Sequence, residues 1–269
     1  MTIQIWYHAH CMDGLGAAWA AHNHFKEDAG YIPVQYGEPH PEVGDGDEVF
    51  ILDFSYPREV LTEIAEKAAW VTVMDHHKTA QQDLEGLELP NGCITFDMNH
   101  SGARLTWNRF RPYKTPPFLI DYIEDRDLWK WELPYTREVS AWLGSKNWSI
   151  TELYDAADLL DENLEGVTEY GKIILNYKSL LVDRIAEKAF MTNLAGYEVP
   201  CVYSSIFQSE LGNKLAKGHP FAAVIAVPSS TEEWVSLRSA EDGVDVSVIA
   251  KQFGGGGHKH AAGFKRVLS

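Results

Sequence analysis

Apolar and polar positions alternate with two different periods in the first half of the chain. Ile3, Ile5 and Tyr7 recur at every second position, which predicts a strand, and the alanine-rich segment 16–25 predicts a helix. Further strands are expected at 48–54, 70–74 and 93–98, and further helices from Pro57, over 101–110 and from residue 116. This alternation predicts an α/β fold, a mostly parallel sheet with helices on both faces.

The second half of the chain changes character twice. Residues 151–192 have a helical pattern and are predicted to form a connector. The last part has strand patterns at 199–203, 221–227 and 233–238, and a helical pattern at 244–253. We therefore expect a larger domain at 1–150 and a smaller α/β domain at 193–269.

Polar residues follow the predicted strands of the first domain. Asp13, Asp53, Asp75, His76 and His77 all fall at or just past a strand end, and parallel sheets collect ligands at the carboxyl ends of their strands. Carboxylates suit Mg²⁺ and Mn²⁺, and imidazole favours a transition metal. A single such residue more often just ends a strand in a polar turn. Several together predict a divalent metal centre, in which two ions ~4 Å apart support in-line attack on a phosphodiester.

A run of four glycines, residues 254–257, precedes His258 and Lys259. It is either a flexible turn or a loop whose backbone N–H groups approach a phosphate. No Gly-Lys-Ser/Thr follows, so the run is not a P-loop. Arg238 ends a predicted strand of the same domain. It either holds a phosphate through two parallel hydrogen bonds or is a solvated charge.

Composition narrows the possible partners and compartment. The chain has 23 basic and 39 acidic residues and a net charge of −16, which argues against coating long nucleic acid but permits a short nucleotide ligand. Its three cysteines, Cys11, Cys93 and Cys201, form no CxxC pair, which favours a reducing, cytoplasmic environment. The N-terminal segment lacks a signal-peptide pattern, and no apolar run approaches the ~18 residues of a spanning helix, so no membrane partner is expected.

Five segments together resemble the motifs of one known family. They are His8–Gly14, Leu52–Asp53, Asp75–His77, Ile123–Asp127, and a glycine element running from Gly255 to Gly263. In this order they resemble the DHH phosphoesterase superfamily, and in particular the subfamily with a DHH-associated C-terminal domain, which includes nanoRNases. The resemblance covers nearly the whole chain, with a catalytic domain at 1–150 and a substrate-binding domain at 193–269.

The resemblance implies a site for two Mn²⁺ ions, with Mg²⁺ as an alternative, between the two lobes. Asp53 would bridge the ions, His8 would bind one of them, and the other would be held by Asp13, His76 and Asp125. His77 would lie near the scissile phosphate, and Asp75 would orient the histidines. The substrate-binding residues would be Arg238, Gly255, Gly256, Gly257 and His258.

The chain departs from the family pattern in its first motif. Many members have two aspartates there, and Cys11 replaces the first of them. The first metal site would then bind its ion more weakly, hold another kind of ion, or have its ligand set completed by His10. In the fourth motif both Asp125 and Asp127 are available, and Asp125 aligns better with the family pattern.

The resulting expectation is a Mn²⁺-dependent phosphodiesterase, an exonuclease that degrades short oligonucleotides or linear dinucleotides to mononucleotides and does not act on long duplexes. Three alternatives remain open from the sequence. They are a phosphatase for 3′-phosphoadenosine 5′-phosphate, a cyclic-dinucleotide phosphodiesterase, and a nucleotide-binding protein without turnover.

Overall fold

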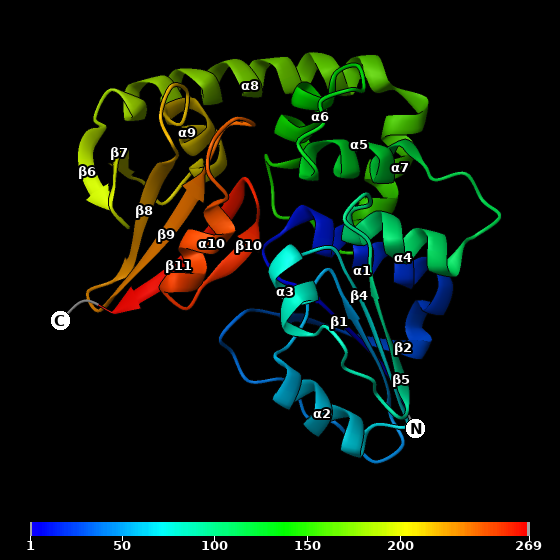
Figure 1. Ribbon diagram of the computed structural model, residues 1–269. Helices are drawn as coiled ribbons and strands as arrows, with labels where there is room; N and C mark the ends of the chain where they lie inside the picture. Colours follow the sequence, from blue (N-terminus) through cyan, green and yellow to red (C-terminus); the bar gives the residue numbers. More distant parts are fainter. Residues whose placement is uncertain (1, 268–269) are drawn as a thin grey trace. The chain divides into compact units, whose positions relative to one another are not determined.

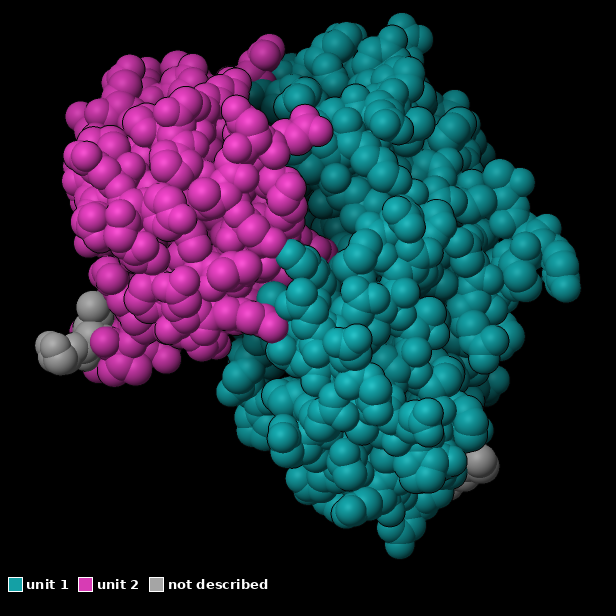
Figure 2. Space-filling model, viewed as in Figure 1, with its two compact units in different colours: residues 1–175 teal, residues 176–269 magenta. Residues whose placement is uncertain are grey.

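The computed structural model describes residues 2–267 and divides into two compact units. Unit 1 comprises residues 1–175 and unit 2 residues 176–269 (Figure 2). The division falls within the long helix α8 (Leu164–Ala186), which belongs, together with α7 (Glu152–Glu162), to the predicted helical segment 151–192.

Unit 1 is built on a five-stranded sheet in which all neighbouring strands are parallel, in the order β2-β1-β3-β4-β5 (Figure 1). The strands are β1 (Ile3–His8), β2 (Ala29–Val34), β3 (Glu48–Leu52), β4 (Trp70–Asp75) and β5 (Gly92–Phe96). This confirms the predicted parallel sheet. Strand β2 was not predicted. It is an edge strand that contains Pro33, and proline, which is tolerated in strands mainly at edges, weakens the sequence pattern of a strand.

Helices cover both faces of this sheet. Ile5, Phe50 and Leu52 pack with α1 (Met12–Phe25) and with the end of α4 (Gly102–Phe110). The alternate positions Trp6 and Ile51 pack with α2 (Arg58–Lys67) on the opposite face. A short helix, α3 (Lys78–Asp83), follows β4. Each large apolar side chain buried in this way contributes about 1.5–3 kcal/mol.

A helical layer completes unit 1. It contains α1 and α4, α5 (Phe118–Asp127), α6 (Thr136–Leu143), α7 and the start of α8, packed around Trp19, Leu119, Leu153 and Leu160. A 3₁₀ turn, η1 (Lys26–Asp28), follows α1. The predicted serine cap of α4 is confirmed, since Ser101 Oγ accepts a hydrogen bond from Arg104 N.

Unit 2 has a mixed six-stranded sheet in the order β10-β11-β9-β8-β7-β6. Its elements are β6 (Phe190–Leu194), β7 (Tyr197–Tyr203), α9 (Gln208–Leu215), β8 (Ala222–Ser229), β9 (Glu232–Arg238), α10 (Val246–Gln252), β10 (Gly256–His258) and β11 (Ala261–Val267). Helix α10 packs on one face, and α9 with the end of α8 on the other. The smaller α/β fold is confirmed, whereas β6, α9, β10 and β11 were not predicted.

Within residues 2–267, no helix combines the length and the apolar character that a membrane crossing requires.

Candidate metal centre

Three neighbouring strands of unit 1 are followed by polar residues at their carboxyl ends. In the register of β1, β3 and β4, the residues that follow the last shared row are His8, Asp53 and Asp75. Asp53 has a φ of 55°, in the left-handed region that residues other than glycine rarely adopt. Such backbone strain costs about 1–3 kcal/mol and gathers at functional sites. The predicted row of polar strand ends is therefore present.

Asp53 lies at the centre of this group and is 1% exposed. His76 Nε2 lies 3.0 Å from Asp53 Oδ1, and His8 Nδ1 lies 3.5 Å from Asp53 Oδ2. Asp53 takes part in two sets of possible metal ligands. One set is Asp13, Asp53 and His76, and the other is His8, Cys11 and Asp53; within each set the ligand atoms all lie within 4.8 Å of one another. Asp53 belongs to both sets, which is the placement that a carboxylate shared by two ions requires.

Cys11 occupies the position of the missing aspartate of the first motif. Its Sγ belongs to the set with His8 and Asp53. His10, the alternative donor, is exposed and belongs to none of the ligand sets formed within residues 2–267. Burial and the charge of Asp53 raise the pKa of the Cys11 thiol well above its usual value. The structure thus brings Cys11, and not His10, to this side of Asp53.

Helix α4 fixes the carboxylate of Asp13. Gly102 N donates to Asp13 Oδ2 at 2.6 Å, and Ala103 N donates to Asp13 Oδ1 at 2.9 Å. These N–H groups lie in the first turn of the helix, where they have no partner within the helix and carry partial positive charge. Asp13 Oδ2 also lies 3.5 Å from His76 Nε2. No sequence pattern indicated this support, because it joins residues far apart in the chain.

Two glycines allow the side chains of the centre to approach one another. A Cβ on Gly102 would lie 2.4 Å from Asp53 Cβ and 2.8 Å from Asp53 Oδ1. A Cβ on Gly14 would lie 2.2 Å from the carbonyl oxygen of His8. Both distances are far below van der Waals contact, so close packing requires glycine at both positions.

Gly102→Ala is therefore expected to weaken the binding of a divalent cation at this centre by about tenfold or more, because overpacking costs about 1–3 kcal/mol and the added methyl group must displace Asp53. Gly30→Ala is the matched control, since the nearest atom to a Cβ there is Ile3 O at 4.0 Å. Calorimetric titration with Mn²⁺ measures the difference. Equal Mn²⁺ affinity in the two variants would show that the position of Asp53 does not matter for binding.

The fourth motif places Asp127, and not the predicted Asp125, beside the histidines. Asp127 Oδ2 lies 3.5 Å from His76 Nε2. Both oxygens of Asp125 accept hydrogen bonds from the loop after α5, Oδ1 from Glu132 N at 2.9 Å and Oδ2 from Thr136 Oγ1 at 2.5 Å. Residues two apart on a helix point to different sides, so only one of the two aspartates can face the site. The structure therefore places Asp127, rather than the predicted Asp125, beside His76.

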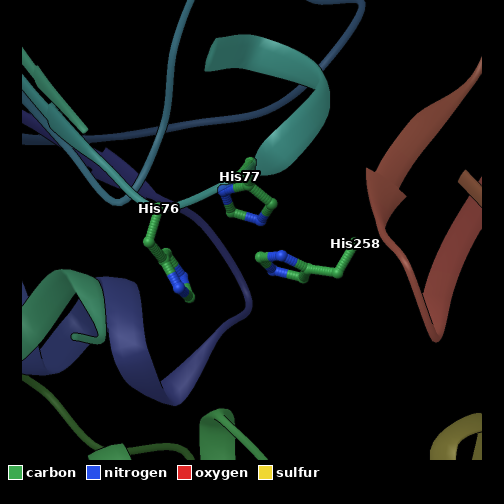
Figure 3. A group of neighbouring side chains, drawn as sticks. All are labelled: His76, His77 and His258. Carbon is green, nitrogen blue, oxygen red and sulfur yellow. The ribbon is translucent and has the colours of Figure 1, made fainter. Parts of the chain in front are cut away.

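Asp75 orients His77. Asp75 Oδ1 lies 2.6 Å from His77 Nδ1 and also accepts hydrogen bonds from the backbone N–H groups of His76 and His77. Ser55 Oγ donates to Asp75 Oδ2 at 2.7 Å, a contact that the sequence did not indicate. Figure 3 shows the two imidazoles leaving successive positions between β4 and α3. Asp75 thus contacts the ring of His77, while the ring of His76 faces the carboxylates of Asp13, Asp53 and Asp127.

The charges of the centre favour a cation. Burial and the charges of Asp53 and Asp127 raise the pKa of Asp13 well above its usual value. Burial also raises the pKa of Asp127. Burial works in the same direction on Asp53, but the hydrogen bond and charge of His76 hold its pKa well below the usual range. Burial opposes the charged form of His76, yet the hydrogen bond to Asp53 and the neighbouring carboxylates raise its pKa to about 10.

The donor atoms fit divalent cations. Asp53 Oδ2 and His8 Nδ1 are buried, and no residue between 2 and 267 makes a hydrogen bond of ordinary geometry with either atom. A buried polar atom left unsatisfied costs about 1–3 kcal/mol, and a cation between the two would satisfy both. Carboxylate oxygens are also ligands that Mg²⁺ and Mn²⁺ accept, and imidazole nitrogens are ligands that divalent transition metals accept.

Two of the predicted substrate-binding residues of unit 2 share one face of its sheet. Ala261 of β11 pairs with His258 of β10 and also with Arg238 of β9. Residues opposite one another on adjacent strands point to the same side, so His258 and Arg238 do so as well. Arg238 Nη2 donates to Ser209 Oγ of α9 at 2.8 Å. The two predicted residues thus lie on the same face of this sheet, two strands apart.

The glycine run is partly a strand rather than an open turn. Gly256 and Gly257 belong to β10. A Cβ on Gly255 would lie 2.1 Å from Gly263 O, and one on Gly257, which has a φ of 136°, would lie 2.6 Å from Ala261 O. Close packing of β10 on β11 therefore accounts for these two glycines without a ligand. Phosphate binding by this segment stays a prediction.

Comparison with known proteins agrees with these features. The profile of the DHHA1 domain matches residues 203–266, within unit 2. Over 282 aligned positions the chain is 30% identical to the uncharacterized protein R106 of Acanthamoeba polyphaga mimivirus, with 96% of this chain and 66% of that protein covered. It is 27% identical to oligoribonuclease NrnB of Bacillus subtilis (strain 168), with 94% and 70% covered. The chain thus spans about two thirds of the length of these relatives.

A solved structure, described as the DHH domain of a member of a family of ribosomal proteins, shares the fold. Superposition of this chain on that structure gives a TM-score of 0.58 at 12% sequence identity, and the alignment covers 99% of this chain and 83% of the other. Sequence similarity along nearly the whole chain and the matched C-terminal domain lead to one conclusion about the family. The chain belongs to the DHH phosphoesterase superfamily.

Proposed function

We propose that this chain is a Mn²⁺-dependent phosphodiesterase that degrades short oligonucleotides or linear dinucleotides to mononucleotides. The observation that carries the proposal is the membership of Asp53 in two ligand sets, one with His8 and the other with His76. The relative NrnB is described as an oligoribonuclease and aligns with 94% of this chain. That similarity supports short oligonucleotides as the substrate class.

The proposed ligands divide between the two sides of Asp53. His8 and Cys11 lie on one side, Asp13, His76 and Asp127 on the other. When bound, two divalent ions supply a water molecule of lowered pKa and neutralise charge on the phosphodiester. The protein contributes the fixed positions of these donors, through the strand ends and through the N-terminus of α4.

His77 is proposed to act on the substrate phosphate. Its Nδ1 is paired with Asp75, so a hydrogen bond to a phosphate oxygen would come from Nε2. Burial disfavours the charged imidazole, but the charge and hydrogen bond of Asp75 raise the pKa of His77 above its usual value. A protonated His77 would stabilise negative charge that develops on the phosphate.

Unit 2 is proposed to bind the substrate through Arg238, through His258 and through Gly255, Gly256 and Gly257. Guanidinium groups bind phosphate with two parallel hydrogen bonds, and backbone N–H groups of glycines can be approached closely. The net charge of −16 disfavours long duplexes. We also propose a cytoplasmic location, in keeping with the free thiols of Cys11, Cys93 and Cys201.

The direct test incubates the protein and Mn²⁺ with a 5′-labelled linear dinucleotide. The expected result is release of labelled mononucleotide that stops when the metal is chelated. Parallel reactions with 3′-phosphoadenosine 5′-phosphate and with a cyclic dinucleotide compare the competing substrate classes. Faster hydrolysis of either one would replace the proposed substrate. Binding of the dinucleotide without any product, at saturating Mn²⁺, would instead indicate a nucleotide-binding protein.

A further inference from the structure

The two sides of Asp53 offer donors of different chemical character. One side presents the imidazole of His8 and the thiol of Cys11 together with Asp53. The other presents Asp13, Asp53 and His76, with Asp127 Oδ2 3.5 Å from His76 Nε2. Thiolates prefer borderline or soft ions, whereas carboxylate oxygens prefer hard ions such as Mg²⁺ and Mn²⁺. The two positions therefore differ in the ion that they should select.

We propose that the Cys11 thiolate binds the ion on the His8 side, and that this position selects a borderline-soft divalent cation of the Zn²⁺ and Co²⁺ class. The carboxylate-rich side would retain Mn²⁺ or Mg²⁺. The inference rests on the proposed two-ion centre and specifies which cation each half takes.

The local structure leaves the Cys11 side chain available for this role. Cys11 is the N-cap residue of α1, but its side chain makes no capping hydrogen bond. The chain turns between His8 and Cys11 through His10, whose φ is 55°. This turn returns Cys11 to the end of β1, so that its Sγ joins the ligand atoms of His8 and Asp53.

A second observation points to a ligand at the same place. Asp53 is only 1% exposed, and its Oδ2, which faces His8 Nδ1 at 3.5 Å, has no hydrogen-bond partner among residues 2–267. A cation held by one imidazole, one thiolate and one carboxylate would satisfy this atom. Three protein ligands also leave a position for water or substrate, as in catalytic zinc sites.

The first test uses Co²⁺ as a spectroscopic probe. Binding of Co²⁺ to the wild-type protein is expected to produce a near-ultraviolet thiolate-to-cobalt absorption band, which Cys11→Ser removes. Serine is a favourable N-cap residue, so this variant should remain folded. Cys93→Ser is the matched control, because Cys93 lies on β5 with its Sγ 3.7 Å from Thr72 Oγ1 and belongs to no ligand set within residues 2–267. An unchanged band in Cys11→Ser would overturn the proposal.

The second test restores the aspartate that many members of the family carry. Cys11→Asp is expected to shift the preference of the protein from Zn²⁺ toward Mn²⁺ by about tenfold or more, because oxygen replaces sulfur as the donor. Equilibrium dialysis against mixtures of the two ions, followed by metal analysis, measures the preference. An unchanged preference would contradict the role of Cys11. These readouts do not depend on turnover, so a failed dinucleotide assay would count against the proposed function alone.

Discussion

Asp53→Asn is expected to lower kcat/KM for a dinucleotide by about a thousandfold or more. Asp53 belongs to three of the four ligand sets formed by the described residues, including the set with His8 and the set with His76. Its loss would therefore affect both of the proposed ions at once. The expected loss of roughly 4 kcal/mol is in the range that metal ions contribute to stabilising charge in a transition state. Asparagine keeps the size of the side chain and an oxygen that can accept from His76, so the fold should persist.

Thermal unfolding distinguishes a lost metal centre from a damaged fold. Mn²⁺ is expected to raise the Tm of the wild-type protein, because a ligand that binds only the folded state stabilises it. The Asp53→Asn variant should show little or no such shift. Asp45→Asn is the matched control, since Asp45 is exposed in the turn before β3, at the opposite end of that strand from Asp53. Retention of both the Mn²⁺-dependent Tm shift and most of the activity in Asp53→Asn would contradict a bridging role.

The fold could be predicted where side-chain periodicity is strong. Buried parallel strands such as β3 and β4 read as continuous apolar runs, and α4 begins at a recognisable serine cap. The elements that were missed have weaker local patterns. Strand β2 contains a proline, and β10 lies within a glycine run, where backbone pairing and not side-chain pattern determines the strand.

The part of the candidate site that lies at strand ends could be predicted from the sequence. His8, Asp53 and Asp75 follow three adjacent parallel strands, so their proximity follows from the topology. Contacts between distant segments were not predictable. The hydrogen bonds from the first turn of α4 to Asp13 join residues about 90 positions apart in the chain. Which of the two aspartates of α5, Asp125 or Asp127, faces the site depends on how that helix is rotated about its axis.

The two aspartates of α5 are expected to respond in opposite ways to substitution. Asp127→Ala should weaken Mn²⁺ binding and lower kcat/KM by about a hundredfold, since loss of even an outer partner of a metal site typically costs about 10–100-fold. The metal-free variant should be about as stable as the wild type. Burial and the charge of Asp53 raise the pKa of Asp127, so its ionised form gains little from the folded surroundings.

Asp125→Ala should instead destabilise the protein and leave Mn²⁺ affinity nearly unchanged. Asp125 is 3% exposed and accepts hydrogen bonds from Glu132 N, Leu133 N and Thr136 Oγ1. Each buried donor left without a partner costs about 1–3 kcal/mol, so a loss of roughly 3 kcal/mol in the free energy of unfolding is expected. Urea unfolding of the metal-free proteins and Mn²⁺ titration of the folded ones separate the two effects. If Asp125→Ala lost Mn²⁺ affinity while Asp127→Ala kept it, the assignment of the fourth-motif ligand would have to return to Asp125.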